Sequence, residues 1–397
     1  MRRVAVTWLE RRRRLCVPPK CEHSTNSWSA RWDRGTTFGG ATSSSRTRFG
    51  AAVPCCVFCS SSRLRTCSST LCSDVVPLRR DSQRSAMTGV RHVLRPLTPL
   101  PRRLGSFSDR VLCRWVVDTA RGLGFTHPTL WPNDVAYASL IRRTGWPTVD
   151  DVTDDWLLAP FAPQEIARLR VLDEIALAHA HEVVACSPVL AASRGKQRDV
   201  TLVPNGVVRE HFRSPRPRPR DLPFAPTAVY VGTLHDSRLD VDLLIELARS
   251  LTELSVVLVG PDALHVASRR RITALPNIHV LGSRPYADVP AYYQHADIIL
   301  VPHRATAFTE SLDPINAYEC LLLDVPVVAT PVAGFRELEA CLDVVPAEFF
   351  VAAVQAVLAA PPRRQDPSEP TTWAERADEF ELVLARARAC AEKALSD

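Results

Sequence analysis

Residues 310–335 read ESLDPINAYECLLLDVPVVATPVAGF, and the pattern in this segment indicates the fold class. Asp313 and Pro314 predict the start of a helix over residues 315–323, because aspartate caps helices and proline fits their first turn. The apolar residues 327–329 then predict a short strand that is buried on both faces. A helix, a buried strand and a glycine-containing turn in succession indicate one unit of a parallel sheet with helical crossovers.

The same pattern extends over residues 227–346. Short apolar runs alternate there with segments of helical spacing. Strands are expected at residues 228–231, 255–259, 278–281, 298–301, 327–329 and 344–345. Helices are expected at residues 241–251, 264–274, 289–295, 315–323 and 334–340. We therefore predict a six-stranded, doubly wound domain, in which ligands bind beyond the carboxyl ends of the strands.

An earlier segment, residues 95–212, carries a weaker form of this alternation. Helices are expected at residues 106–124, 134–143, 163–181 and 188–193, and strands at residues 129–131, 148–153, 182–186 and 200–203. Residues 213–226 hold five prolines and predict a linker. Residues 347–397 predict two helices, at 348–359 and 372–395, that pack back across the domains. The expected fold class is α/β, with two Rossmann-like domains.

Residues 1–94 differ from the rest in charge, cysteine content and patterning. Residues 1–90 carry 16 lysines and arginines against 5 acidic residues, and 7 of the 12 cysteines precede residue 73. Three interpretations remain open: a zinc site, a disordered basic tail, and translation out of register over residues 10–86. The zinc site would use Cys56, Cys59, Cys67 and Cys72. We favour the shifted frame, because arginine, serine, cysteine and proline enrichment is typical of GC-rich coding DNA read out of frame.

Composition excludes several classes of protein. Apolar residues make up 46% of the chain and charged residues 23%, which indicates a largely globular protein. No apolar run approaches the ~18 residues of a membrane-spanning helix. The 11 histidines form no metal-binding pair at helical spacing, and the basic excess is confined to the N-terminal segment, which argues against nucleic-acid binding. The five remaining cysteines are scattered singly, as in a protein of the reducing cytoplasm.

Polar residues follow the first strand expected in the second domain. Gly232 would let the backbone approach a ligand, and Thr233 offers a hydroxyl group. His235 and Arg238 offer positive charge, and the helix expected after Asp240 would present free backbone N–H groups to an anion. The loop indicates an anion site, although an ordinary strand–turn–helix connection explains it equally well.

Two further loops reach the same edge of the sheet. Arg304 follows the strand at residues 298–301 and offers a further charge. Glu319 lies within the next helix, where a carboxylate could accept two hydrogen bonds from a ribose diol, and its apolar neighbours indicate an enclosed helix face. Thr330 and Gly334 follow the strand at residues 327–329 and lie at this edge as well.

These three loops resemble the nucleotide-sugar domain of GT-B glycosyltransferases, and in particular glycosyltransferase family 4 and its relatives. Residues 310–335 resemble that group's block P-x-K-x-x-E-Y-x-A-x-G-x-P-V-V-A-T. Three first-domain segments, TVDDVTDDW (148–156), VVACSP (183–188) and VTLVPNGV (200–207), resemble strand ends of an actinobacterial-type subgroup. The resemblance covers roughly residues 95–345, so the first domain would lack units that residues 10–86 ought to supply.

The resemblance implies roles for individual residues. The implied donor-binding residues are Gly232, Thr233, His235, Asp313, Asn316, Glu319, Thr330 and Gly334, with Glu319 on the ribose hydroxyls and Gly232 and Thr233 against the diphosphate. The implied catalytic residues are Asp154, which would orient the acceptor, and Arg238 and Arg304, which would stabilise the departing diphosphate. Ser187 and Asn205 would lie at the interdomain cleft. Three positions depart from the family pattern. Asn316 replaces the family's usual lysine, and Asp324 replaces a glycine. Glu310 lies one place away from the first glutamate of the family's Glu-x7-Glu pair, whose second glutamate is Glu319.

The sequence therefore predicts a glycosyltransferase that uses a nucleotide-diphospho-sugar. As the resemblance implies, it would retain anomeric configuration and need no metal or other cofactor. The acceptor would be a carbohydrate, a lipid-linked molecule or a small molecule, and the enzyme would be cytoplasmic, at most peripheral to the membrane's inner face. The alternative is a non-catalytic remnant with a nucleotide-binding second domain and a damaged first domain. A sugar-nucleotide epimerase would need a further set of acid/base carboxylates that the sequence does not offer.

Overall fold

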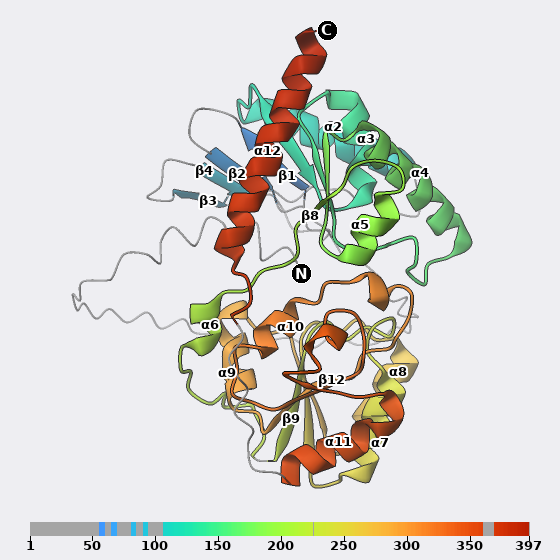
Figure 1. The fold of residues 1–397 in the computed structure, drawn as a ribbon, viewed down its shortest axis with the longest axis vertical. Coiled ribbons are helices and arrows are strands. Elements are labelled where there is room, and N and C mark those ends of the chain that lie inside the picture. The colour runs from blue at the N-terminus through green and yellow to red at the C-terminus, as the bar shows by residue number, and fades with distance from the viewer. Residues whose placement is uncertain are drawn as a thin grey trace, which may run out of the picture.

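The computed structural model describes residues 55–59, 65–69, 81–84, 90–93, 106–224, 226–359 and 369–396. Two α/β domains lie one above the other in Figure 1. One connection between them runs through β8 (Thr201–Leu202) and α6 (Arg209–Arg213), and the other leads into α12 (Trp373–Ser396). The parallel sheets with helical crossovers confirm the predicted α/β fold class.

The second domain is built on a six-stranded parallel sheet. Its strands are β9 (Thr227–Val231), β10 (Ser255–Val259), β11 (Ile278–Gly282), β12 (Ile298–Val301), β13 (Val327–Ala329) and β14 (Asp343–Val344). Their order in the sheet is β11-β10-β9-β12-β13-β14. The chain thus proceeds outward from β9 in one direction and from β12 in the other, which creates a switch point between these two strands.

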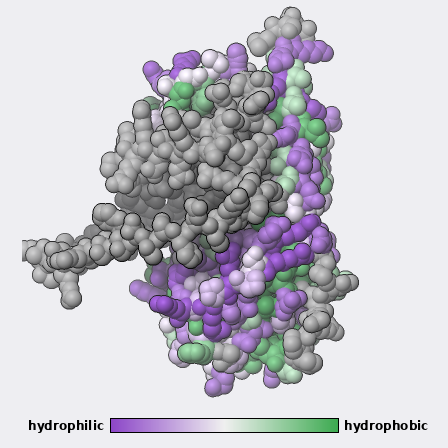
Figure 2. Space-filling view, turned by 90° about the vertical axis from the view of Figure 1, so that its left-hand side faces the viewer, coloured by the Kyte–Doolittle hydropathy of each residue, from purple (hydrophilic) through white to green (hydrophobic). Residues whose placement is uncertain are grey.

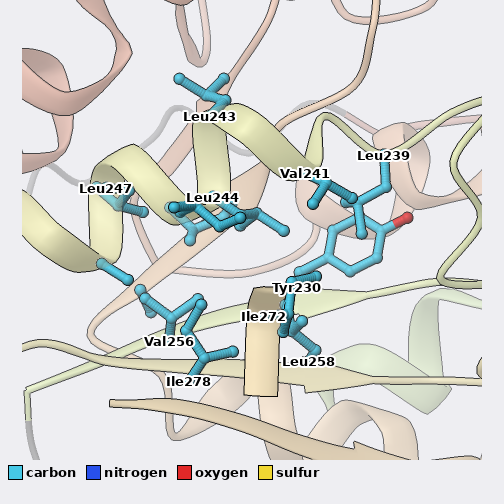
Figure 3. Close-up of a cluster of buried hydrophobic side chains, with 14 of the residues drawn as sticks. Tyr230, Leu239, Val241, Leu243, Leu244, Leu247, Val256, Leu258, Ile272 and Ile278 are labelled. Carbon is cyan, nitrogen blue, oxygen red and sulfur yellow. The ribbon is translucent and has the colours of Figure 1, made fainter. Parts of the chain in front are cut away.

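Helices cover both faces of this sheet. One face is covered by α7 (Val241–Ser250), α8 (Val266–Thr273) and α11 (Ala347–Ala359), and the other by α6, α9 (Val289–Gln294) and α10 (Ile315–Cys320). Ile298 and Leu300 of β12 enter the first core cluster, part of which is shown in Figure 3, while Ile299 and Val301 enter the second. This alternation is the period of two that places successive side chains on opposite faces of a strand.

The helix predicted at residues 334–340 is wrong. A single 3₁₀ turn, η5 (Arg336–Leu338), stands in its place. Gly334 has a left-handed backbone with φ of +83°, and β14 follows closely, so the intervening segment has room for one turn only.

The first domain has a smaller parallel sheet with strand order β6-β7-β8. These strands are β6 (Val149–Val152), β7 (Glu182–Ala185) and β8. The neighbouring β5 (Pro128–Pro132) pairs with β1 in another sheet, and an isolated parallel bridge between Leu130 and Thr148 links it to β6. Its helices are α2 (Ser106–Gly122), η2 (Val135–Tyr137), α3 (Ala138–Thr144), α4 (Pro163–His179) and α5 (Pro188–Arg194).

The last helix of the chain completes this domain. α2, α3 and α4 share a core cluster on one face of the sheet, whereas Phe380, Val383 and Leu384 of α12 pack against Trp131 and Val149 on the other. Figure 1 shows α12 running along the first domain. The C-terminal segment therefore supplies a structural layer to a domain that begins hundreds of residues earlier.

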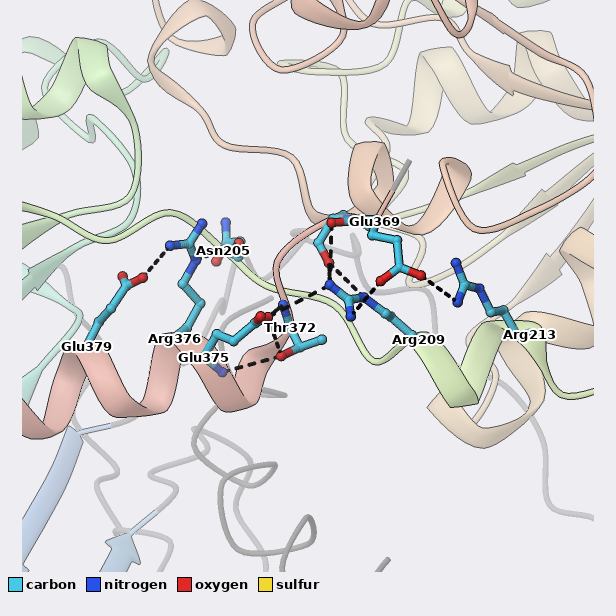
Figure 4. Close-up of polar contacts among 9 residues, drawn as sticks. Asn205, Arg209, Arg213, Glu369, Thr372, Glu375, Arg376 and Glu379 are labelled. Atoms are coloured by element: carbon cyan, nitrogen blue, oxygen red, sulfur yellow. Dashed lines mark hydrogen bonds and ion pairs between the residues drawn. The ribbon is translucent and has the colours of Figure 1, made fainter. Parts of the chain in front are cut away.

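Polar contacts fix the two segments that cross between the domains (Figure 4). Arg209 Nη2 donates to the carbonyl oxygen of Pro370 at 2.9 Å, and Arg376 Nε donates to the carbonyl oxygen of Asn205 at 3.4 Å. A Cβ at Gly206 would lie 2.7 Å from the backbone nitrogen of Trp373. Glycine therefore permits the close approach of the two crossing segments.

The N-terminal segment contributes four short strands to the described structure. β1 (Cys55–Cys59) pairs antiparallel with β2 (Arg65–Ser69) and with β5, and β3 (Asp81–Arg84) pairs with β4 (Val90–Val93). Most of residues 10–86, to which the zinc, basic-tail and reading-frame interpretations apply, lie outside the described residues.

Candidate functional site at the domain contact

The carboxyl ends of β9, β12 and β13 lie side by side at the switch point of the second sheet. This is the edge at which open parallel sheets bind ligands. The two domains meet here through buried contacts. The Ser187 hydroxyl donates to the carbonyl oxygen of Ser311 at 2.7 Å, and Asn205 Nδ2 donates to that of Asp313 at 2.7 Å. The candidate site therefore lies at the contact between the domains.

Gly232 directly follows β9 and packs over Tyr230. A Cβ at position 232 would come within 2.6 Å of the Tyr230 hydroxyl oxygen. That hydroxyl is hydrogen-bonded to Nε2 of His303 at 3.2 Å. Burial, assisted by Arg238, lowers the pKa of His303 to about 3, so its imidazole is neutral. Tyr230 and His303 therefore form an uncharged support beneath Gly232.

His235 is a neutral side chain rather than the positive charge that the sequence predicts. Its Nδ1 accepts a hydrogen bond from the backbone N–H of Ser237 at 3.1 Å. Burial, and then Arg238, lower the pKa of His235 below its ordinary value. An imidazole that accepts through Nδ1 carries its proton on Nε2, so His235 presents an N–H donor.

Arg238 joins the two domains. Its Nη2 donates to Asp154 Oδ1 at 2.7 Å, and these side chains are 24% and 18% exposed. The guanidinium lies over the ring of Phe308, 5.2 Å from the ring centroid. The ring of Trp156 lies 5.9 Å from that of Phe308 between centroids, which adds an aromatic contact across the domains. Two of the predicted catalytic residues, Asp154 and Arg238, are therefore in direct contact.

Arg304 is directed to the beginning of α7. Its Nη2 donates to Asp242 Oδ2 at 3.2 Å, and its Nε lies 3.9 Å from Asp240 Oδ1. Asp240 also accepts from the backbone N–H of Leu243 at 3.2 Å and so caps the helix. One of the N–H groups expected to be free at this helix start is therefore already bonded to a carboxylate, and the anion site there stays a prediction.

Asp313 does not cap α10. The helix begins at Ile315, and Pro314 holds the N-cap position without a side-chain hydrogen bond. The Asp313 carboxylate accepts from the backbone N–H of Asn205 at 2.5 Å and from the Tyr318 hydroxyl at 2.7 Å. The predicted cap is wrong because these two donors take both oxygens, and they turn the side chain toward the interdomain segment.

Glu319 is enclosed within the protein. It lies in α10, is 6% exposed and accepts hydrogen bonds from the hydroxyl groups of Tyr286 and Tyr293. Burial raises the pKa of Glu319 to about 8, although both hydrogen bonds act in the opposite direction. At neutral pH the acid is mainly protonated, so beyond the two tyrosine hydrogen bonds it still offers one O–H donor and remaining acceptor capacity to a ligand.

The remaining predicted residues define the loops around α10. The Thr330 hydroxyl donates to the carbonyl oxygen of His303 at 2.7 Å, which ties the end of β13 to the loop after β12. A Cβ at Gly334 would meet Pro314 Cδ at 2.5 Å. Asn316 is half-buried in the first turn of α10. Thr330 and Gly334 therefore shape the site through the backbone around it.

Four residues of this site were not predicted from the sequence: His303, Tyr286, Tyr293 and Phe308. His303 lies two residues beyond the end of the buried strand β12, so the rule that selected Gly232 and Thr330 could have selected it. Tyr286 and Tyr293 reach Glu319 from η3 (Tyr286–Asp288) and α9, and no local pattern indicates this long-range contact.

A comparison with known families agrees with this geometry. Residues 225–360 match the family described as glycosyl transferases group 1. A protein of Bacillus subtilis (strain 168) named as a teichuronic acid biosynthesis glycosyltransferase, TuaH, is 27% identical over 154 residues. That match spans 38% of this chain and 38% of the relative. The expected relationship to this group is thus confirmed for the second domain, whereas the actinobacterial-type subgroup stays a prediction.

Solved structures extend the similarity to both domains. Sucrose-phosphate synthase from Thermosynechococcus elongatus superposes with a TM-score of 0.56 at 20% identity, covering 81% of this chain and 85% of that one. The UDP-forming α,α-trehalose-phosphate synthase of Burkholderia vietnamiensis gives 0.53 at 12% identity, covering 81% and 88%. Anabaena HepE in complex with UDP-glucose gives 0.50 at 18% identity, covering 76% and 81%. The chain therefore has the two-domain GT-B fold.

Within the described segments, no helix combines the length and the apolar character needed to cross a bilayer. On the face seen in Figure 2, hydrophilic residues predominate over the coloured part of the second domain, and hydrophobic residues are interspersed among them.

Proposed function

We propose that this protein is a glycosyltransferase that transfers a sugar from a nucleotide-diphospho-sugar to an acceptor hydroxyl group. The family match of the second domain supports this proposal, as does the fold shared with HepE, which was solved with UDP-glucose. We further propose that the reaction takes place in the cytoplasm, retains the anomeric configuration and requires no metal ion.

In the proposed reaction, the bond between the anomeric carbon and the diphosphate breaks, and negative charge develops on the leaving diphosphate. We assign Arg238 and the Nε2–H of His235 as the donors that stabilise that charge. Such preorganised donors typically contribute about 10²–10³-fold in rate each. Asp154, which holds Arg238 from the first domain, is the residue that we assign to acceptor orientation.

The observation that carries the proposal is the enclosed carboxyl group of Glu319 beside the switch point. Its remaining donor and acceptor positions suit the two hydroxyl groups of a ribose. We expect Glu319→Ala to weaken UDP binding by about 1–3 kcal/mol, the typical cost of leaving a buried hydrogen-bonding group of the ligand without its partner. Calorimetric titration with UDP, GDP and dTDP measures this loss and identifies the preferred base.

Glu310→Ala is the matched control. Glu310 belongs to the same stretch, but its carboxylate pairs with Arg336 on the surface at 2.8 Å. The control variant should bind UDP as the wild type does. Equal UDP affinity of the Glu319→Ala variant and the wild type would contradict the proposed site, and UDP binding without sugar transfer to any acceptor would favour the non-catalytic alternative.

A further inference from the structure

A separate polar cavity lies in the first domain beside the Asp154–Arg238 contact. We call it the β6 cavity. Its lining includes Asn133, Asp150, Asp154, Trp156, Asp173 and Arg194. Asp154 and Trp156 also make the contacts to Arg238 and Phe308 described above, so the cavity adjoins the proposed sugar-transfer site.

Asp150 brings a buried carboxyl group without a hydrogen-bond donor into this cavity. The side chain is 7% exposed, and no described residue donates a hydrogen bond to its carboxyl. Its neighbours are engaged: the Trp131 indole donates to Asp151 at 3.1 Å, and Arg194 donates to Asp173 at 3.2 Å. Burial, and then the charge of Asp173, raise the pKa of Asp150 to about 7.

Beside Asp150, other residues that line the cavity carry polar atoms that are buried without a hydrogen-bond partner in the described structure, and two of them bear on the kind of ligand. One is the acceptor Asn133 Oδ1, and the other is the donor Arg194 Nε. Buried polar atoms are almost always hydrogen-bonded in proteins, so unpaired atoms around a cavity indicate a missing partner. A hydroxyl group both donates and accepts, whereas an ammonium only donates and a phosphate only accepts. Together with the Asp150 carboxyl, the acceptor Asn133 Oδ1 and the donor Arg194 Nε therefore match a hydroxyl group.

The size and the charge of the β6 cavity further restrict which ligand group it can hold. The cavity has room for about two water molecules, which suits a hydroxyl or hydroxymethyl group rather than a whole sugar ring. Four aspartates and one arginine are among its lining residues, so an anion would meet net repulsion. The described residues include no group of three or more histidine, cysteine or acidic side chains placed to hold a metal ion.

We propose that the β6 cavity receives an uncharged, hydroxyl-bearing end of the sugar acceptor and discriminates against phosphorylated and carboxylated sugars. This inference rests on the proposed function, because it assigns the acceptor class of the same enzyme. It makes Asp150 a residue that determines acceptor specificity.

Saturation-transfer NMR with the full chain and saturating UDP tests the proposal. The probes are glucose, glucosamine, glucose 6-phosphate and glucuronate, each at the same concentration. We expect glucose to bind at least tenfold more tightly than either anion, and more tightly than glucosamine. Asp150→Leu should abolish glucose binding, while Asp150→Asn should retain it and reduce the discrimination against glucose 6-phosphate. Asp199→Asn, which changes an exposed aspartate of the same domain, is the control and should behave as the wild type.

UDP affinity measured on the same samples separates the two proposals. Intact UDP binding with loss of glucose binding in Asp150→Leu supports the cavity assignment. Equal or tighter binding of glucose 6-phosphate, binding of none of the four sugars, or glucose binding unaffected by Asp150→Leu would overturn it and leave the nucleotide site intact. Failure of the wild type to bind any nucleotide would instead overturn the proposed function.

Discussion

Gly334 shows how a single residue shapes the loops around α10, where we propose that the nucleotide binds. Its φ of +83° is left-handed, and a Cβ would meet Pro314 Cδ at 2.5 Å. Gly334→Ala should therefore lower the free energy of unfolding by about 2–4 kcal/mol, because backbone strain and displacement of Pro314 add together. Gly282→Ala is the control, since Gly282 has a φ of +75° but no atom within 4 Å of the added Cβ. Gly282→Ala should lower the free energy of unfolding, measured with urea, by about 1 kcal/mol. Equal losses in the two variants would show that the contact with Pro314 is irrelevant.

Glu319 should make the stability of the second domain depend on pH. Because its folded pKa of about 8 exceeds the ordinary value of 4.5, its contribution is fully present below pH 4.5 and is lost as the pH rises through 8. Glu319→Gln removes this titration. Between pH 5.5 and 7.5 the wild type should lose about 2–3 kcal/mol relative to the variant, at about 1.4 kcal/mol per pH unit. Parallel stability curves from urea unfolding would contradict the buried placement of this acid.

Sequence reasoning at the residue scale succeeded where the chemistry is local. Glu319 was expected to be enclosed because its helix neighbours are apolar, and the structure places it 6% exposed. Prediction from the sequence failed where residues distant in the chain bond to a side chain or bury it. The Asp313 carboxylate is taken by Asn205, more than a hundred residues away, and the charge of His235 is suppressed by burial. Neither the bond from Asn205 nor the burial of His235 can be predicted from the residues next to Asp313 or His235 in the sequence.

Among the elements, the strands were the easiest to predict. Those of the second domain are buried on both faces, so each reads as a continuous apolar run, and all six occur where they were expected. Helix lengths were less certain. α10 ends at Cys320 although apolar residues continue to position 323, because hydrophobic spacing cannot distinguish a helix from the packed loop that follows it.

α12 should be essential to the first domain. Its Leu384 is 4% exposed and packs in one cluster with Trp131, Val149 and Val184, whereas Leu382 is 65% exposed. Leu384→Ala should lower the free energy of unfolding by about 2–5 kcal/mol, because apolar burial is lost and a cavity is left behind. Hydrogen–deuterium exchange should then accelerate in β6 and β7 but not in β10. Leu382→Ala should change neither the stability nor the exchange rates. Unchanged exchange in both variants would contradict the structural role of α12 in the first domain.

For the whole molecule, the sequence predicted the class of architecture but not the contacts between the domains. Ser187 and Asn205 were expected at the cleft through family resemblance, and both bond to the second domain. The pairing of Asp154 with Arg238 could not be predicted, because it depends on how two separately folded domains are oriented. It joins a residue assigned to the acceptor side with one assigned to the diphosphate.

This pairing predicts a competition that involves the whole molecule. A donor diphosphate and the Asp154 carboxylate would both seek the guanidinium of Arg238, so Asp154→Asn should tighten UDP binding by about two- to fivefold, the scale of a partly exposed ion pair. Arg238→Ala should weaken UDP binding, and adding Asp154→Asn to it should have no further effect, because the two residues act through one contact. Asp118→Asn, which breaks an exposed pair with Arg114, is the control in the same calorimetric series. Weaker UDP binding by Asp154→Asn would reverse the interpretation: the carboxylate would then hold Arg238 in position for the diphosphate instead of competing with it.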